Sequence, residues 1–189
     1  MSFANYIKRL WNFLKEDSWQ SWIVSLILII IFIKLILFPS LSLVTGTSLP
    51  LVIVESCSMY HESSFDDWWN SNSEWYESKG ISKEDFEKYT LKNGLNKGDI
   101  VLVLGNSEYK KGDIIIYNGG RQYPIIHRII SENPIETKGD HNQGQLPVEQ
   151  NIPKQYIIGK AKARIPLLGW VKLIFFESFK PQDQRGLCK

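Results

Sequence analysis

The segment from Trp22 to Phe38, WIVSLILIIIFIKLILF, constrains the fold of this 189-residue chain more than any other. It carries a single charge, at Lys34, close to its far end. At about 1.5 Å per residue, a helix of this length nearly crosses the hydrocarbon core of a bilayer. Lys34 can extend to the nearer interface, and Pro39 is expected to end the helix. We therefore predict a transmembrane anchor over residues 21–39.

A cleaved signal peptide is the alternative interpretation of this segment. The apolar run is longer than a usual signal core, and no A-x-A-like cleavage site follows it, so we favour a retained anchor. Lys8, Arg9 and Lys15 precede the span, whereas no basic residue lies between Lys34 and Lys79. The positive-inside rule then places the N-terminus in the cytoplasm. We predict a single-pass protein of the cell membrane whose larger part is extracytoplasmic.

Residues 1–20 are expected to form a cytoplasmic amphipathic segment. Four apolar side chains of residues 3–14 share one helical face: Phe3, Ile7, Leu10 and Leu14. Such a helix can lie in the membrane interface. A helix that packs on a partner protein explains the pattern equally well.

Charge and cysteine content restrict the possible partners. The formal net charge is +2 and the basic residues are scattered, which gives no reason to expect a nucleic-acid partner. The two cysteines, Cys57 and Cys188, do not form a disulfide framework, so a bond between them is not favoured. Neither belongs to a CxxC pair, so we expect no zinc, no other metal and no cofactor. Residues 181–189 are predicted to be a flexible tail.

Residues 40–180 are predicted to form a mostly β domain. Short apolar, β-branched runs alternate with turn residues, as is typical of such domains. The predicted strands lie in GDIVLVLG (98–105), GDIIIYNGG (112–120), YPIIHRII (123–130), IETKGD (135–140) and YIIGKAKARIP (156–166).

Residues 61–97 are predicted to be a helical insertion in this domain. Ser82 with Asp85 resembles a capping box, and Gly94 stands where a helix-ending glycine would. Four aromatic residues are expected to pack the insertion onto the β-domain: Trp68, Trp69, Trp75 and Tyr76. Membrane contact or a wall of a substrate groove is the functional alternative. The apolar stretch at 164–179 is too short and interrupted for a second span, so it is a core strand or a membrane-facing edge.

Three potential nucleophiles lie together in LPLVIVESCSMYHESS, residues 49–64: Ser56, Cys57 and Ser58. Acyl transfer needs such a nucleophile, a base and usually an acid that orients the base. Alternate side chains of an extended segment share a face, so the two serines should point together with Cys57 opposite. His127, in an apolar strand, and Asp140, in a Gly-Asp turn, are weak candidates when taken singly.

The order of these features is more specific than any one of them. An anchor, S-C-S-M, two G-D-I boxes, I-I-H-R, K-G-D-x-N and I-G-K-A follow one another, and the whole resembles the type I signal peptidase family over residues 22–175. The resemblance implies a signal-peptidase-like β-domain, with Ser58 as nucleophile and Ser56 in the oxyanion hole. It implies His127 as general base, as in the archaeal and endoplasmic-reticulum branch, and Asp140 as the acidic partner. The insertion favours an archaeal member.

Two departures from the family pattern concern the site. Cys57 stands where relatives have glycine between the serines. Reticulum-type relatives often carry a second Asp six residues after the Gly-Asp, and Leu146 occupies that position here. Three arrangements are then compatible with the sequence: Asp140 alone, Glu149 in the role of the acid, or a dyad without an acid. We predict Asp140.

These features predict a membrane-bound serine endopeptidase that removes signal peptides from secreted pre-proteins. Its expected partners are signal peptides and the lipid bilayer, close to the secretion translocon. A non-catalytic membrane-anchored β-domain that binds secreted clients is the main alternative, and a thiol enzyme acting through Cys57 is a third.

Overall fold

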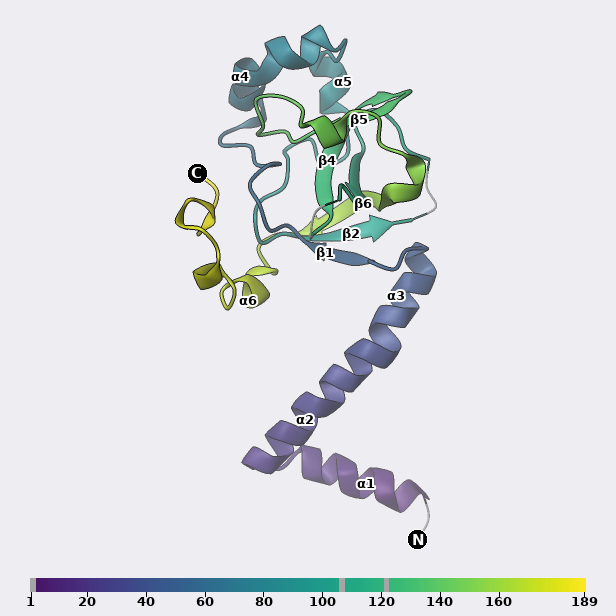
Figure 1. The fold of residues 1–189 in the computed structure, drawn as a ribbon. Helices are drawn as coiled ribbons and strands as arrows, with labels where there is room; N and C mark the ends of the chain where they lie inside the picture. The colour runs from purple at the N-terminus through teal and green to yellow at the C-terminus, as the bar shows by residue number, and fades with distance from the viewer. Residues whose placement is uncertain (1–2, 106–107, 121–122) are drawn as a thin grey trace. The chain divides into compact units, whose positions relative to one another are not determined.

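The chain divides into two compact units, Met1–Val44 and Thr45–Lys189. A computed structural model describes residues 3–105, 108–120 and 123–189, and its ribbon is drawn in Figure 1. The boundary between the units lies a few residues after the predicted one at residues 39/40.

The N-terminal unit consists of helices. Helix α1 (Phe3–Leu14) confirms the helix predicted at residues 3–14. Helix α2 (Trp19–Phe32) begins at Ser18, whose side chain accepts a hydrogen bond from the Ser21 N–H at 3.2 Å. It continues through a π-helical turn, η1 (Ile33–Leu37), into α3 (Phe38–Thr45). The resulting helix, Trp19–Thr45, is 27 residues long and apolar enough to cross a membrane.

The prediction that Pro39 ends this helix is wrong. Proline lacks an N–H, and its ring normally clashes with the carbonyl four residues earlier. Directly before Pro39, the ladder widens, because the Phe38 N–H bonds to the Ile33 carbonyl five residues back. A π-turn of this kind makes room for the ring, so the helix continues to Thr45.

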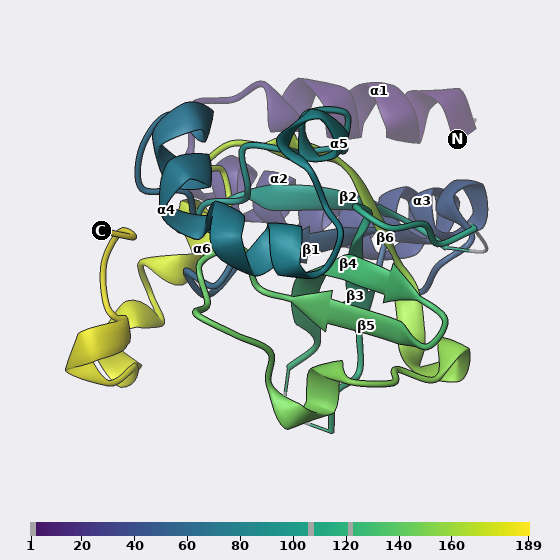
Figure 2. The ribbon, with the colours of Figure 1, turned by 90° about the horizontal axis from the view of Figure 1, so that it is seen from above.

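The second unit is built on one six-stranded antiparallel sheet with the order β1-β2-β6-β3-β4-β5. Figure 2 shows β3, β4 and β5 side by side. The strands are β1 (Leu51–Ile53), β2 (Ile100–Leu104), β3 (Ile114–Tyr117), β4 (Ile125–Glu132), β5 (Ile135–Lys138) and β6 (Ile157–Ile165). All five strands predicted after residue 97 are therefore confirmed. The description "mostly β" is only partly right, because about 40% of the chain is helical and 18% is strand.

The core of this unit lies on both faces of the sheet. All four side chains of β3 are buried, since this strand is covered on both sides. One cluster joins Val54, Met59 and Leu95 to β2, β3 and β6. Met59 directly follows Ser58, so packing of the core holds one end of the serine segment.

The helical insertion contains α4 (Phe65–Ser78) and α5 (Lys83–Glu87), with Ser64 and Ser82 as N-caps. Its buried aromatic residues pack against Ile130 of β4, as the aromatic pattern predicts. Gly94 does not end a helix. It has φ 69°, and a Cβ there would lie 2.2 Å from the Met59 carbonyl oxygen, so only glycine allows this approach.

After β5 the chain forms two 3-10 turns, η2 (Pro147–Glu149) and η3 (Lys154–Tyr156), and then enters β6. Beyond β6 it forms α6 (Trp170–Leu173), η4 (Glu177–Phe179) and η5 (Gln182–Gln184), in the yellow part of Figure 1. The stretch at 164–179 is not a core strand, because most of its large apolar side chains are exposed.

Candidate active site

The two candidate serines lie in a turn that follows β1. Strand β1 ends at Ile53, and the Tyr60 N–H closes the turn on the Cys57 carbonyl at 3.0 Å. The hydroxyls of Ser56 and Ser58 are 3.2 Å apart. They share a face as predicted, but strand alternation is not the reason, since the segment is no longer extended there.

Cys57 is turned away from the serines into a disulfide with Cys188, with the two Cα atoms 5.5 Å apart. The expectation that these cysteines stay unpaired is therefore wrong. Residues separated by 131 positions can be brought together only by the tertiary fold, and sequence spacing carries no sign of it. The bond also overturns the interpretation of residues 181–189 as a flexible tail, and a cysteine held in a disulfide supplies no thiol nucleophile.

The backbone around Ser58 is held by the turn that follows β5. The Ser58 carbonyl accepts the His141 N–H at 2.9 Å, and the Met59 carbonyl accepts the Leu95 N–H at 2.8 Å. The Met59 sulfur accepts the Asp140 N–H at 3.4 Å. Backbone N–H groups of the K-G-D-x-N box thus hold the segment that contains Ser58 and Met59.

Gly139 brings Ser58 and His127 to one point. A Cβ on this glycine would lie 2.7 Å from the Ser58 carbonyl oxygen and 2.8 Å from His127 Nε2. Side chains essentially never approach other atoms so closely, so the glycine allows the imidazole to lie beside the nucleophile segment.

The acid that contacts His127 is Glu149, at the end of η2. His127 Nδ1 is hydrogen-bonded to Glu149 Oε1, and both side chains are buried. The other carboxylate oxygen of Glu149 accepts the Leu146 N–H, and Thr137 Oγ1 lies 3.5 Å from Oε1. Because a carboxylate accepts from Nδ1–H, the neutral imidazole carries its lone pair on Nε2, the nitrogen that faces Gly139.

In this structure Ser58 Oγ is bonded to Ser56 Oγ, and no hydrogen bond joins it to His127 among the described residues. Catalytic hydrogen bonds are often long without substrate and shorten in the complex. The arrangement pairs the imidazole with a carboxylate and brings the Ser58 backbone close to that imidazole, which are elements that acyl transfer uses.

Asp140 was predicted to be the acidic partner of His127, but it contacts other residues instead. It is fully buried and accepts hydrogen bonds from Arg128 Nη2 at 2.7 Å, Tyr76 Oη at 3.1 Å and His61 Nε2 at 3.1 Å. Burial alone would raise the pKa of Asp140, but the Arg128 charge and the hydrogen bonds from His61 and Arg128 hold that pKa well below its usual range. Asp140 is thus an ionised structural carboxylate.

Alternation along β4 explains this exchange of partners. His127 and Arg128 are neighbours in a strand, so their side chains point to opposite faces of the sheet. One carboxylate cannot serve both faces. Asp140 pairs with Arg128 on the side of the helical insertion, and Glu149 pairs with His127 on the other side.

Sequence reasoning did not identify the buried cluster around Asp140. His61, which stacks on Trp68 with ring centroids 3.7 Å apart, comes from the segment after Ser58, and Tyr76 comes from α4. Burial lowers the pKa of His61, and the Asp140 carboxylate only partly offsets this effect. The available signal was the arginine of I-I-H-R, since a buried arginine requires an acid on its own face of the sheet.

Lys138 adds a second buried cation on this side. It lies opposite Arg128 across the β4–β5 ladder, with its ammonium 4.8 Å from the centre of the Trp75 ring and 4.9 Å from that of Tyr76. Burial lowers the pKa of Lys138 to about 8, against the opposing effect of Asp140.

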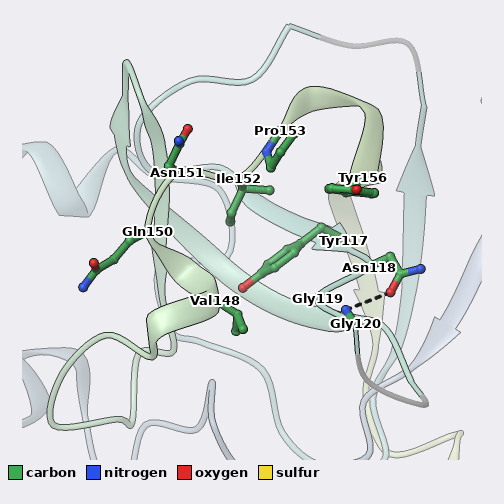
Figure 3. Close-up of a pocket in the computed structure, with 10 residues that line it drawn as sticks. All are labelled: Tyr117, Asn118, Gly119, Gly120, Val148, Gln150, Asn151, Ile152, Pro153 and Tyr156. Atoms are coloured by element: carbon green, nitrogen blue, oxygen red, sulfur yellow. Dashed lines mark hydrogen bonds between the residues drawn. The ribbon is translucent and has the colours of Figure 1, made fainter.

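A cavity of about 400 Å³ lies at the far end of β3 (Figure 3). It is lined by Tyr117, residues 118–120, Val148, residues 150–153 and Tyr156, and none of the predicted site residues is among them. Tyr117 Oη is 3.0 Å from Thr137 Oγ1, so a chain of polar groups leads from this cavity to Glu149.

In the described part of the chain, no group of three or more His, Cys, Asp or Glu side chains is placed to hold a metal ion. No protein-family model matches the chain, and no curated protein is significantly similar to it.

Proposed function

We propose that this protein is a membrane-bound serine endopeptidase that removes N-terminal signal peptides from secreted pre-proteins, as its resemblance to type I signal peptidases implies. The observation that carries the proposal is the approach of the Ser58 backbone and His127 Nε2 at Gly139, with Glu149 bonded to the other nitrogen of that imidazole. Ser58 comes from the turn after β1, His127 from β4 and Glu149 from η2. A non-catalytic binding module has no need for this order of groups.

In the proposed reaction, Ser58 Oγ attacks the carbonyl carbon of the scissile bond. His127 Nε2 takes the hydroxyl proton and then gives it to the leaving amine. Water hydrolyses the resulting ester by the same proton route in reverse. Glu149 keeps the proton on Nδ1 and stabilises the imidazolium, the role that Asp140 was expected to fill.

Ser56 is placed to assist at the oxyanion. Its hydroxyl lies 3.2 Å from that of Ser58, so it can donate to the oxygen that becomes negative. The Ser58 backbone N–H would be the second donor. Losing one such donor typically raises the barrier by about 2.7–4 kcal/mol.

The edge of the sheet supports the proposed peptide substrate. Strand β1 is the first strand in the sheet order, and in the described sheet it pairs only with β2. Its other edge can accept an extended peptide as an added strand, which binds main chain without requiring a particular sequence. Because β1 leads directly to the serine turn, such a peptide would run toward Ser58.

The membrane is the second proposed partner. The Trp19–Thr45 helix is long and apolar enough to span a bilayer, and the Lys and Arg pattern favours an extracytoplasmic larger unit. That unit also exposes apolar side chains after α6, including Phe175 at 72% and Phe179 at 83%. Exposed apolar surface of this kind is typical of membrane contact. A site on the extracytoplasmic side of the membrane would meet the end of a signal peptide as it leaves the translocon.

Cleavage of a pre-protein by the detergent-solubilised full chain tests the proposal. Ser58→Ala and His127→Ala should abolish release of the mature protein, identified by its new N-terminus. Ser63→Ala is the matched control, because this exposed serine, among the residues described, donates only to the adjacent Ser64 carbonyl, and it should leave the rate unchanged. Full activity of Ser58→Ala would disprove the mechanism, and binding without cleavage by the unaltered chain would favour the client-binding module.

A further inference from the structure

The segment 177–188, called the C-terminal strap below, is fastened to the loop that carries the candidate nucleophile. Its Cys188 is bonded to Cys57, the residue between Ser56 and Ser58. The strap therefore reaches the centre of the serine turn, although no known role of the family motifs requires it.

A buried lysine holds the middle of the strap. Lys97, only 1% exposed, donates to Glu177 Oε2 at 2.7 Å, to the Gln184 carbonyl at 2.8 Å and to the Gly186 carbonyl at 3.0 Å. Glu177 Oε2 also accepts the Gly186 N–H at 2.7 Å. All three donors of the ammonium are thus used by one segment, which is the compensation that a buried charge requires.

The strap also contacts the residue before the first serine. Lys180 Nζ donates to the Glu55 carbonyl at 3.1 Å and lies 3.8 Å from the Glu55 carboxylate. The strap is thus bonded to the loop at residues 55 and 57, while the Ser56 side chain between them stays exposed. The contacts at residues 55 and 57 restrict the backbone that orients the Ser56 and Ser58 hydroxyls.

We propose that the C-terminal strap is a positioning element for Ser58, closed by the Cys57–Cys188 bond and seated by Lys97. The proposal rests on the proposed peptidase function. A dithiol reductant supplies two electrons and two protons, giving two cysteine thiols and the oxidised reductant. The freed loop then loses the grip at residue 57, and the misplacement of Ser58 slows the chemical step.

The test compares the oxidised full chain in detergent with the same protein treated with dithiothreitol. Two quantities are measured: amide hydrogen exchange over residues 54–60, and kcat and KM for a pre-protein. We expect faster exchange in this loop with unchanged protection of β3, and a fall in kcat of about ten- to a hundredfold with little change in KM, because small misplacements of a reacting group cost that much.

Two variants make the comparison specific. Cys57→Gly/Cys188→Ser should have the low kcat already and should no longer respond to dithiothreitol. Lys97→Met should also speed exchange over residues 54–60 while its disulfide is intact, and Lys97→Arg should recover part of the protection. Dithiothreitol sensitivity of the cysteine-free variant would assign the effect to the reagent and overturn the proposal.

Equal exchange and equal kcat in the oxidised and reduced chains would overturn the positioning role. Loss of β3 protection on reduction would also overturn it, because the bond would then support the whole unit. Failure of the peptidase function is distinguishable: the oxidised chain and Ser58→Ala would both be inactive, while the exchange of residues 54–60 would still report on the strap.

Discussion

Replacing Asp140 by Asn separates a structural from a catalytic carboxylate. Both Asp140 and Arg128 are 0% exposed, and three nitrogen–oxygen contacts of 2.7 to 3.2 Å join them. Asn removes the negative charge and leaves the buried guanidinium without a counter-charge. Breaking one partner of such a buried pair typically costs about 3–5 kcal/mol of unfolding free energy.

The upper part of that range is expected here. The two carboxylate oxygens also accept from Tyr76 and His61, and an amide offers only one oxygen for all these donors. The double variant Asp140→Leu/Arg128→Met should lose less than the sum of the single losses, since no charge stays unpaired. It should not be neutral, because Arg128 also donates to the carbonyls of Thr90, Leu91 and Gly112.

Denaturant unfolding of the full chain in detergent, followed by tryptophan fluorescence, measures these losses. Asp66→Asn is the matched control, because its ion pair with Lys83 is exposed and should leave the midpoint unchanged. The pH dependence of the unfolding free energy is a second test of the role of Asp140. The folded pKa of Asp140 is depressed, so its contribution is present above the unfolded value near 3.8 and is lost as pH falls below it. Asp140→Asn should lack this acid-induced loss.

An unfolding free energy of Asp140→Asn within about 1 kcal/mol of that of the unaltered chain would show that the buried Asp140–Arg128 pair is not a main stabilising contact. If the variant kept its stability and lost cleavage by about four orders of magnitude, Asp140 would be the orienting acid after all. We expect Asp140→Asn to lose stability while its folded fraction keeps a normal kcat.

Three further predictions concern the two faces of β4 and β5. Glu149→Gln should lower kcat by up to about 10⁴-fold in the cleavage assay, since an amide no longer selects the Nδ1–H tautomer of His127, and a normal kcat would contradict the assignment. Gly139→Ala should lower kcat by about a hundredfold through displacement of its neighbours, whereas Gly144→Ala, with nothing within 4 Å of its Cβ, should be silent. The folded pKa of Lys138, about 8, lies below the unfolded value of 10.5, so the unfolding free energy should rise by about 2 kcal/mol from pH 7.5 to 9.5, and a Lys138→Met variant should show no such rise.

The sheet could be predicted from sequence because each strand is a local pattern. The two G-D-I boxes and the apolar run around His127 carry β-branched residues between turn signals, and the structure has strands at each of them. The membrane helix could also be predicted from the sequence, but the position of its end could not. A proline ends a helix when the hydrogen bonds before it follow the regular α-helical pattern, and the π-turn at Ile33–Leu37 departs from that pattern.

The partners of His127 could not be read in the same way. Glu149 and Asp140 both follow β5 in irregular chain, and only the path of that chain decides which of them returns to which face of β4. Motif order favoured Asp140, whereas alternation along β4 indicates only that a buried Arg128 needs an acid of its own on the face opposite His127. The Cys57–Cys188 pairing depends on a contact across the whole domain, which no local pattern encodes.

That pairing also sets an order of events during synthesis of the chain. All six strands lie between residues 57 and 188 or immediately before them, and translation proceeds from the N-terminus. The bond can therefore form only after the residues of every strand have been synthesised, and such bonds persist in oxidising compartments. A nascent chain on the cytoplasmic side would lack the Cys57–Cys188 bond at its serine turn. The proposed protease would therefore complete its folding on the side of the membrane to which its substrates are exported.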